Sequence, residues 1–281
     1  MEAGVTVGNI GTLYIVSTPI GHMGDFSFRA VEVLRQVATV LAEDTRHSRH
    51  LLERYEIGTP LLPYHEHNEA KATPRLIQRL LEGEQLALIS DAGTPLLSDP
   101  GARLVQAAVA AGITVTSVPG ASALLAALVV SGLALDRFTF YGFLPRKGAE
   151  RRAAIAEIAD LRHAAVVYEA PLRVGPTLAD IATAGAGSRA TVVARELTKQ
   201  FEELRRGTVA DLAAYYVGVP PRGEVVIIVA GGSAPVAASE EEIRARAVEL
   251  RADGRTPRDV AAALQVELGA SRNVAYRLAR E

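Results

Sequence analysis

The sequence contains no cysteine, which excludes disulfide bonds and metal sites built on thiolates and fits a reducing cytosol. No basic start precedes an apolar run near residue 1, so we expect no secretory signal. The longest apolar run, residues 121–135, is interrupted by Ser131 and Gly132 and is shorter than the roughly 18 residues of a membrane span. We therefore expect a cytoplasmic protein with no membrane segment.

The chain also lacks an excess of either charge. It has 30 basic and 32 acidic residues, a formal net charge of −2. A protein that binds nucleic acid through its overall charge would be strongly basic, so any contact with RNA must come from a local patch. Clustered basic residues are equally typical of a solvated surface. The candidates for an RNA-binding patch are Arg46, Arg49, Arg146, Lys147, Arg151 and Arg152.

Its length of 281 residues and its 49% hydrophobic content suffice for two domains of ordinary size. Short apolar segments alternate with amphipathic ones, which predicts an α/β fold of βαβ units with parallel strands. We place one α/β domain at 11–133, a second at 137–232, a flexible linker at 231–238 and a helical appendage at 239–281. The predicted strands are 13–18, 39–42, 61–64, 86–90, 114–118, 138–142, 164–168, 191–194 and 224–229, with looser alternation over 200–206. Helices are expected at 26–37, with Asp25 as N-cap, and at 74–81, and Ser239 to Glu242 has the spacing of a capping box.

The loop after the predicted strand 86–90 is the strongest candidate for a binding site. It is rich in Asp, Gly, Thr and Pro, and a helix is expected to follow with Asp99 as N-cap and Pro100 at its first position. Ligands of open α/β sheets bind beyond the carboxyl ends of strands. Other polar clusters, at 17–21, 43–46, 65–68 and 119–122, also follow predicted strands. Parallel strands bring these loops to one rim.

Other site classes fit poorly. The glycines of 185–190 precede a strand, whereas a dinucleotide fingerprint follows one. No phosphate-binding loop and no serine-hydrolase elbow is present. His65 and His67 alternate on a segment that we expect to be extended, which would point them to opposite faces, so we predict hydrogen-bonding histidines and no metal site.

Taken together, the motifs resemble the ribosomal RNA small-subunit methyltransferase I family of the tetrapyrrole methylase superfamily. The resemblance covers residues 11–232, and three departures from the usual family pattern lie at His22, Ala121 and Leu172. The matching motifs are Leu-Tyr-Ile-Val-Ser-Thr-Pro-Ile-Gly at 13–21, Ala-Glu-Asp-Thr-Arg at 42–46, Tyr-His-Glu-His-Asn-Glu at 64–69, Ser-Asp-Ala-Gly-Thr-Pro at 90–95, Ser-Asp-Pro-Gly at 98–101, Gly-Phe-Leu-Pro-Arg-Lys at 142–147 and Arg-Glu-Leu-Thr-Lys at 195–199.

The resemblance implies a two-domain tetrapyrrole-methylase-like fold with S-adenosylmethionine in the cleft between the domains, and a homodimer. It implies methylation of the 2′-hydroxyl of a decoding-centre cytidine in bacterial 16S rRNA, within the small ribosomal subunit. The expected donor contacts are Pro19, Ile20, Asp91, Gly93, Thr94, Leu96, Ala121, Ser122, Ala123 and Tyr168. A base or polarising group would assist the weakly nucleophilic alcohol. Its candidates are Asp44, His65, Glu66 and Lys199, among which the sequence does not choose.

Two alternatives remain open. One is a tetrapyrrole methylase that acts on a porphyrinoid carbon, which the basic residues at 145–147 disfavour. The other is a non-catalytic RNA-binding module, which would have no affinity for the donor. The appendage fits either a helix-turn-helix nucleic-acid binder or a module for packing or dimer formation, since it is not strongly basic.

Overall fold

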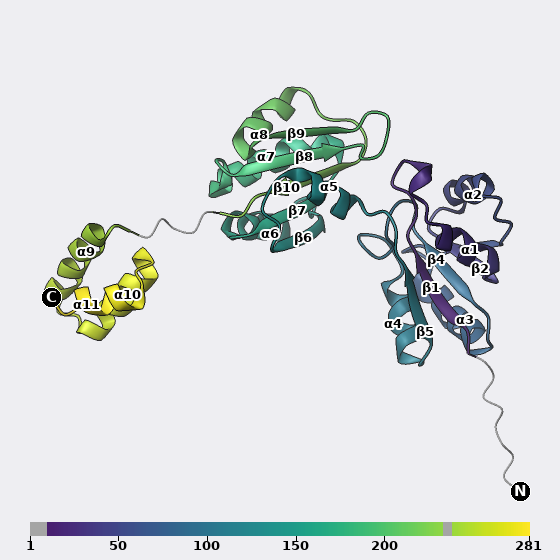
Figure 1. The fold of residues 1–281 in the computed structure, drawn as a ribbon, viewed down its shortest axis with the longest axis horizontal. Coiled ribbons are helices and arrows are strands. Elements are labelled where there is room, and N and C mark those ends of the chain that lie inside the picture. The colour runs from purple at the N-terminus through teal and green to yellow at the C-terminus, as the bar shows by residue number, and fades with distance from the viewer. Residues whose placement is uncertain (1–9, 233–237) are drawn as a thin grey trace, which may run out of the picture. The chain divides into compact units, whose positions relative to one another are not determined.

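The computed structural model describes residues 10–232 and 238–281. The chain divides into two compact units, one formed by Met1–Ala159 and His163–Ala230, the other by Asp160–Arg162 and Gly231–Glu281. The larger unit holds two five-stranded sheets, one in each predicted α/β domain (Figure 1). No helix in the described residues is long and apolar enough to cross a lipid bilayer.

The first sheet is entirely parallel, as predicted, with strand order β3-β2-β4-β1-β5. Its carboxyl ends therefore lie along one edge. Both faces are covered, because separate buried clusters pack on either side of the strands. Its strands are β1 (Thr12–Val16), β2 (Thr39–Ala42), β3 (Leu61–Pro63), β4 (Leu86–Ile89) and β5 (Thr114–Val118). The helices between them are α1 (Phe28–Gln36), α2 (Thr45–Arg54), α3 (Glu69–Leu81) and α4 (Ala102–Ala110).

Three helix starts in this domain differ from the prediction. Ser27, and not Asp25, caps α1 by accepting a hydrogen bond from the Ala30 amide. Helix α3 begins at Glu69 and contains Pro74, which we had taken as its start. Gly101 is the N-cap residue of α4, so Asp99 is not the cap. Only glycine fits there, because its φ is +124° and a Cβ atom would lie 2.4 Å from Leu88 Cδ2.

The second sheet is mixed, with strand order β6-β7-β10-β8-β9. Only the β6–β7 pair is parallel, and the pairs β7–β10, β10–β8 and β8–β9 are antiparallel. The expectation of parallel strands is therefore wrong for this domain, because buried apolar strands carry no mark of their direction. Its strands are β6 (Phe138–Phe143), β7 (Ala164–Glu169), β8 (Ala190–Arg195), β9 (Glu203–Thr208) and β10 (Val225–Val229).

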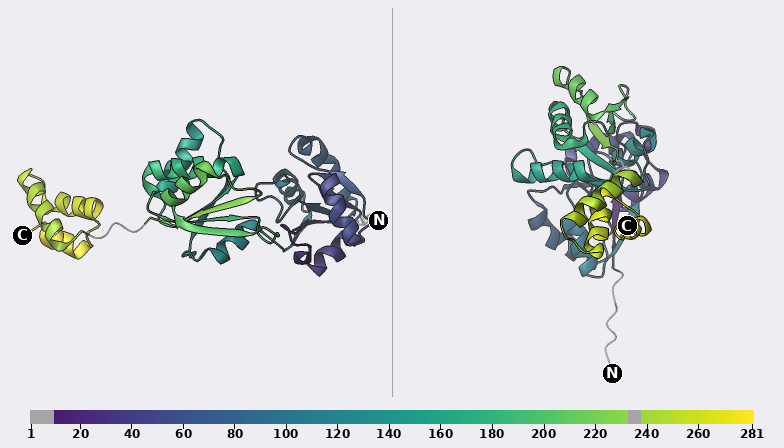
Figure 2. Two further views of the ribbon diagram at one scale, coloured as in Figure 1. Left: turned by 90° about the horizontal axis from the view of Figure 1, so that it is seen from above. Right: turned by 90° about the vertical axis from the view of Figure 1, so that its left-hand side faces the viewer.

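Helices lie on both sides of this sheet (Figure 2). Helix α5 (Ala123–Ser131) follows β5 and packs its buried leucines against β7, β8 and β10. The sequence analysis did not predict α7 and α8. The remaining helices are α6 (Ala149–Asp160), α7 (Val174–Ile181) and α8 (Val209–Gly218).

The smaller unit contains a bundle of three helices, α9 (Glu240–Ala252), α10 (Pro257–Leu268) and α11 (Arg272–Leu278). They enclose an apolar core of their own. The predicted capping box is confirmed, since Ser239 accepts from the Glu242 amide and the Glu242 carboxylate accepts from the Ser239 amide. The helical appendage is thus confirmed, and residues 233–237 of the predicted linker lie outside the described residues.

Candidate functional site

A cavity of about 390 Å³ lies where the carboxyl edge of the first sheet meets the second sheet of the same unit. The loops that follow β1, β2 and β4 line one wall, with the start of α5 beside them. The ends of β6, β7 and β8 and the beginning of β10 line the other. The volume falls in the range of small-molecule sites.

Hydrogen bonds clamp the loop after β4 to the loops after β1 and β5. The amide of Thr18 donates to the Gly93 carbonyl over 2.8 Å, and the Gly93 amide donates back over 3.1 Å. The hydroxyl of Thr94 lies 3.1 Å from Ser17 Oγ and donates to the Ala121 carbonyl. The cavity wall is therefore a fixed surface, because three strand ends share one network.

Gly93 lies in this clamped loop, next to Ile20. Its φ is +81°, a conformation that L side chains rarely adopt. A Cβ atom there would lie 3.2 Å from Ile20 Cγ2 and 3.7 Å from the Ala121 carbonyl oxygen. Gly93 also lines the cavity, so a side chain at this position would be strained and would crowd the wall.

The cavity is acidic. No lysine or arginine occurs among its described lining residues, whereas five carboxyl groups do. A cavity of this kind favours a cationic ligand, since carboxylates at close range repel anions, although two of the five already pair with a basic side chain outside the lining. These groups belong to Glu43, Asp91, Asp99, Glu169 and Glu224.

Two of these carboxyl groups hold their protons more tightly than usual. Burial, and then the neighbouring Glu43 carboxylate, raises the pKa of Asp99 to about 6. Burial, followed by the charge of Asp91, raises the pKa of Glu43. A bound cation would lower the pKa of both carboxyl groups, because it favours their charged forms.

The high pKa of Asp99 predicts a pH-dependent stability. Because the folded-state pKa of about 6 exceeds the ordinary 3.8, Asp99 favours folding below pH 3.8, and this contribution is lost as the pH rises to about 6. The stability gained by Asp99→Asn should therefore grow between these pH values and then stay constant. Urea unfolding of both proteins from pH 4 to 8 measures the difference, and a gain that does not vary with pH would contradict the assignment.

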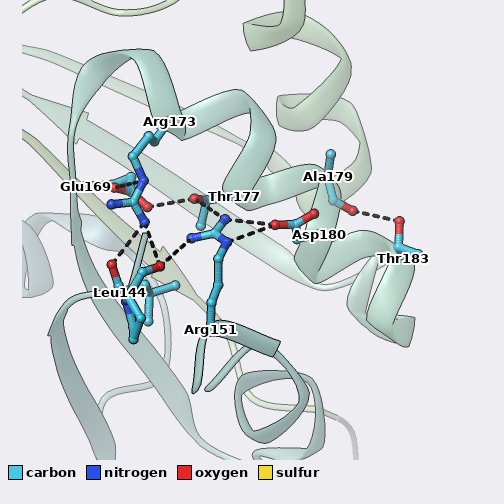
Figure 3. Close-up of polar contacts among 9 residues, drawn as sticks. Leu144, Arg151, Glu169, Arg173, Thr177, Ala179, Asp180 and Thr183 are labelled. Atoms are coloured by element: carbon cyan, nitrogen blue, oxygen red, sulfur yellow. Dashed lines mark hydrogen bonds and ion pairs between the residues drawn. The ribbon is translucent and has the colours of Figure 1, made fainter. Parts of the chain in front are cut away.

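The opposite wall carries an ion pair whose carboxylate is buried. The Glu169 side chain is fully buried at the end of β7, and its Oε1 lies 3.3 Å from Arg173 Nε. The Thr177 hydroxyl donates to Glu169 Oε2 over 2.6 Å. Figure 3 shows how Arg173 also reaches the carbonyl of Leu144, to which it donates over 3.0 Å. This network joins a cavity wall to the turn that begins at Leu144.

Arg151 belongs to the same network. Its guanidinium donates to Asp180 Oδ2 over 2.8 Å and to the Thr177 hydroxyl over 3.0 Å, and its side chain is only 11% exposed (Figure 3). We had predicted Arg151 as an RNA contact. The structure gives its guanidinium a packing role and leaves it little surface for a phosphate.

Seven of the ten predicted donor contacts line the cavity, namely Ile20, Asp91, Gly93, Thr94, Ser122, Ala123 and Tyr168. Pro19 is buried behind the wall. Ala121 contributes its carbonyl to Thr94. The Leu96 side chain packs into the core of the first domain, close to Leu88 and Gly101. The structure therefore does not bring these last three into the cavity lining.

None of the four candidates for the base lies among the described residues that line the cavity. Asp44 caps α2 by accepting from the Arg46 amide over 2.8 Å, and this bond lowers its pKa. Lys199 Nζ lies 3.0 Å from Glu196 Oε1 and 3.1 Å from Glu224 Oε2. Burial lowers the pKa of Lys199, but these carboxylates outweigh it and raise the pKa, so the amine stays protonated.

His65, Glu66 and His67 lie in the turn between β3 and α3. The prediction that the two histidines point to opposite faces is wrong, because their ring centroids lie 6.0 Å apart in an edge-to-face pair. The segment is not extended, since the Asn68 side chain accepts from the His65 amide over 2.9 Å and closes a turn. No group of three or more potential metal ligands occurs in the described ranges.

The other RNA candidates are exposed. The side chain of Arg46 is 92% accessible, and Arg49 lies one turn further along α2. Arg146 and Lys147 are exposed in the turn between β6 and α6, and Arg152 is exposed on α6. These positions suit contacts with phosphates.

The three departures from the family pattern have different surroundings. His22 donates its amide to the Thr198 hydroxyl over 3.0 Å, and its ring accepts from the Gly24 amide. Ala121 packs against the core beneath α5. Leu172 is 78% exposed in a short turn after β7.

The lining residues that sequence reasoning missed include Glu43, Phe143, Glu169 and Glu224. Asp99 had been interpreted only as a helix cap. Glu43 was within reach of the analysis, because it directly follows β2 in the Glu-Asp-Thr-Arg motif. Glu169 ends β7, and Glu224 directly precedes β10. Because these strands are antiparallel, both residues lie at one edge of the sheet, whereas in the predicted parallel sheet they would lie at opposite edges.

Comparison with known proteins identifies the family. Residues 12–213 match the model of the Tetrapyrrole (Corrin/Porphyrin) Methylases. The chain is 49% identical over 269 residues to the ribosomal RNA small subunit methyltransferase I of Xylella fastidiosa strain Temecula1, an alignment that covers 95% of this chain and 98% of the relative. The chain belongs to the ribosomal RNA small subunit methyltransferase I family. The same-named protein of Pseudomonas aeruginosa is 47% identical, with 96% of each chain covered.

Solved structures agree on the fold of this methyltransferase family. Uroporphyrin-III C-methyl transferase from Thermus thermophilus, complexed with S-adenyl homocysteine, matches with a TM-score of 0.58 at 17% identity, covering 78% of this chain and 97% of that one. Diphthine synthase matches with a TM-score of 0.61 at 14% identity, covering 78% and 89%. The resemblance in the motifs and the predicted fold class are confirmed, and with them the prediction of an enzyme.

Proposed function

We propose that this protein transfers a methyl group from S-adenosylmethionine to the 2′-oxygen of a decoding-centre cytidine in 16S rRNA. The acidic cavity carries the proposal. S-adenosylmethionine is a net cation, with a sulfonium and an ammonium group against one carboxylate, and the cavity offers five carboxyl groups and no basic lining side chain in the described residues. Membership of a family whose relatives are named for methylation of small-subunit RNA supports the choice of acceptor.

The protein's share of the chemistry is mainly positioning. The clamped loop after β4 presents a fixed wall to the donor, so the methyl carbon can be held in line with the attacking oxygen. Among the groups near the cavity, Glu43 is better suited than Asp44 to accept the proton of the hydroxyl. Its pKa is raised toward neutrality, whereas that of Asp44 is lowered.

A porphyrinoid acceptor fits less well. Such macrocycles carry several carboxylate side chains, which the carboxyl groups of the cavity would repel. The exposed basic turn of Arg146 and Lys147 suits the phosphates of RNA. A non-catalytic RNA-binding module would not bind the donor, so one calorimetric titration with S-adenosylmethionine separates it from both enzymes.

The RNA contact predicts a change in salt dependence. Replacing both Arg146 and Lys147 with alanine should weaken binding to small ribosomal subunits and flatten the slope of log affinity against log salt by up to about two units. Donor affinity should stay within about twofold, because neither residue lines the cavity. A salt titration of RNA binding, with parallel donor calorimetry, measures both.

The second exposed pair of RNA candidates is tested in the same way with Arg46→Ala together with Arg49→Ala. If both pairs contact RNA, each double variant flattens the slope. An unchanged slope in the Arg146/Lys147 variant would mean that this turn is only solvated surface.

We further propose that the protein acts as a homodimer on the assembled small subunit. Both follow from the family resemblance. Sedimentation of the purified protein tests the dimer. Comparing methylation of naked 16S rRNA with that of intact subunits tests the substrate, and equal rates on both would contradict a subunit requirement.

A further inference from the structure

An irregular end of β6 sets the direction of Phe143. The register between β6 and β7 shifts between Phe140 and Gly142, which leaves Tyr141 as an extra residue. Gly142 has a φ of +61°, and a Cβ atom there would lie 2.7 Å from Ser98 Oγ. A bulge of this kind changes which way the following side chain points, and bulges gather beside active sites. Here the following residue is Phe143, which lines the cavity.

The ring of Phe143 is supported on one side and open on another. It packs edge-to-face on Tyr168, with ring centroids 5.7 Å apart. Tyr168 is itself fixed, since it packs on Phe140 at 4.9 Å and its hydroxyl accepts from the Leu124 amide. Even so, Phe143 is 58% exposed. An anchored aromatic ring with a free surface is preorganised to stack on a flat ligand.

The turn that directly follows Phe143 in the chain carries positive charge. Arg146 and Lys147 are exposed three and four residues after Phe143. Between them, the carbonyl groups of Leu144 and Pro145 accept hydrogen bonds from the half-buried Arg173. Figure 3 shows the contact with Leu144. Proteins hold single-stranded nucleotides by stacking an aromatic side chain on a base and placing basic side chains against the phosphates of the nucleic acid.

We infer that Phe143 stacks on the base of the nucleotide that is methylated and so fixes the ribose at the cavity. The inference rests on the proposed function in that it takes RNA as the acceptor. The donor's cationic groups suit the acidic wall of the first domain, which leaves the open face of Phe143, at the end of β6, for the second substrate.

The test uses the full-length protein and small ribosomal subunits reconstituted with 16S rRNA in which a fluorescent cytidine analogue replaces the target cytidine. Stacking on an aromatic ring quenches such an analogue. The variants are Phe143→Ala, Phe143→Tyr as the conservative replacement, and Phe28→Ala as the matched control. Phe28 is 90% exposed and lies at the start of α1, outside the cavity lining.

Phe143→Ala should abolish the quenching and raise the KM for small subunits by roughly 5- to 100-fold, with donor affinity unchanged. Phe143→Tyr should restore both, and Phe28→Ala should match the parent. Quenching that persists in Phe143→Ala would overturn the inference, and so would a parent that does not quench. A loss of donor affinity with an unchanged KM for RNA would place the ring against the donor and also overturn it. If the parent quenches the RNA but methylates nothing, the proposed function fails while the stacking inference stands.

Discussion

Gly93→Val should abolish binding of S-adenosylmethionine. Valine is strained at a φ of +81°, and its methyl groups would press on Ile20 and occupy the wall of the cavity. We expect donor affinity to fall by about 100-fold or more, which corresponds to about 3 kcal/mol of binding free energy. Isothermal titration calorimetry of the purified variant measures the loss.

The matched control is Gly112→Val. Gly112 has a similar φ of +71° after α4, but nothing lies within 4 Å of the position of its Cβ. It therefore bears the same backbone strain without touching the cavity, and it should bind the donor like the parent. Unchanged donor affinity in a folded Gly93→Val protein would show that the cavity wall does not contact the donor.

Glu43→Gln should lower kcat by about 10²- to 10⁴-fold, the usual contribution of a positioned base. Glutamine keeps the size of the side chain but cannot accept a proton. Donor affinity should fall much less, because four other carboxyl groups line the cavity. Single-turnover methylation of small subunits with saturating donor separates the chemical step from binding.

Asp44→Asn is the control for this prediction. Asparagine is as good an N-cap as aspartate, so α2 should keep its start at Asp44. The variant should retain nearly full kcat if Asp44 only fixes the helix. If Asp44→Asn lowered kcat more than Glu43→Gln, Asp44 would be the base and Glu43 would not.

The first sheet could be predicted because β1, β2 and β4 are largely apolar and a polar cluster follows each of them. β2 and β5 begin and end where the sequence predicts. The rim that collects the loops after β1, β2 and β4 followed from parallel strands alone. The ten donor contacts themselves came from the family resemblance, and seven of them line one cavity.

Two helices and the bulge in β6 could not be predicted, because local residue preferences point elsewhere or because the feature depends on pairing between distant strands. Gly175 and Pro176 disfavour a helix, so the sequence did not predict α7. Pro176 stands in the first turn of α7, where a helix tolerates proline. β-Branched and aromatic residues in α8 favour a strand, and only its capping box of Thr208 and Asp211 indicates a helix. The bulge that turns Phe143 toward the cavity depends on pairing with β7, which lies more than 20 residues away.

The most direct test of the central claim is mass mapping of modified nucleosides. Small ribosomal subunits that lack the modification are incubated with the protein and S-adenosylmethionine, and the 16S rRNA is then digested and sequenced by mass spectrometry. We predict a single new methyl group, on the ribose of one decoding-centre cytidine, that Gly93→Val does not add. A methyl group on a base or at another site, or donor turnover with a porphyrinoid and none with RNA, would contradict the account.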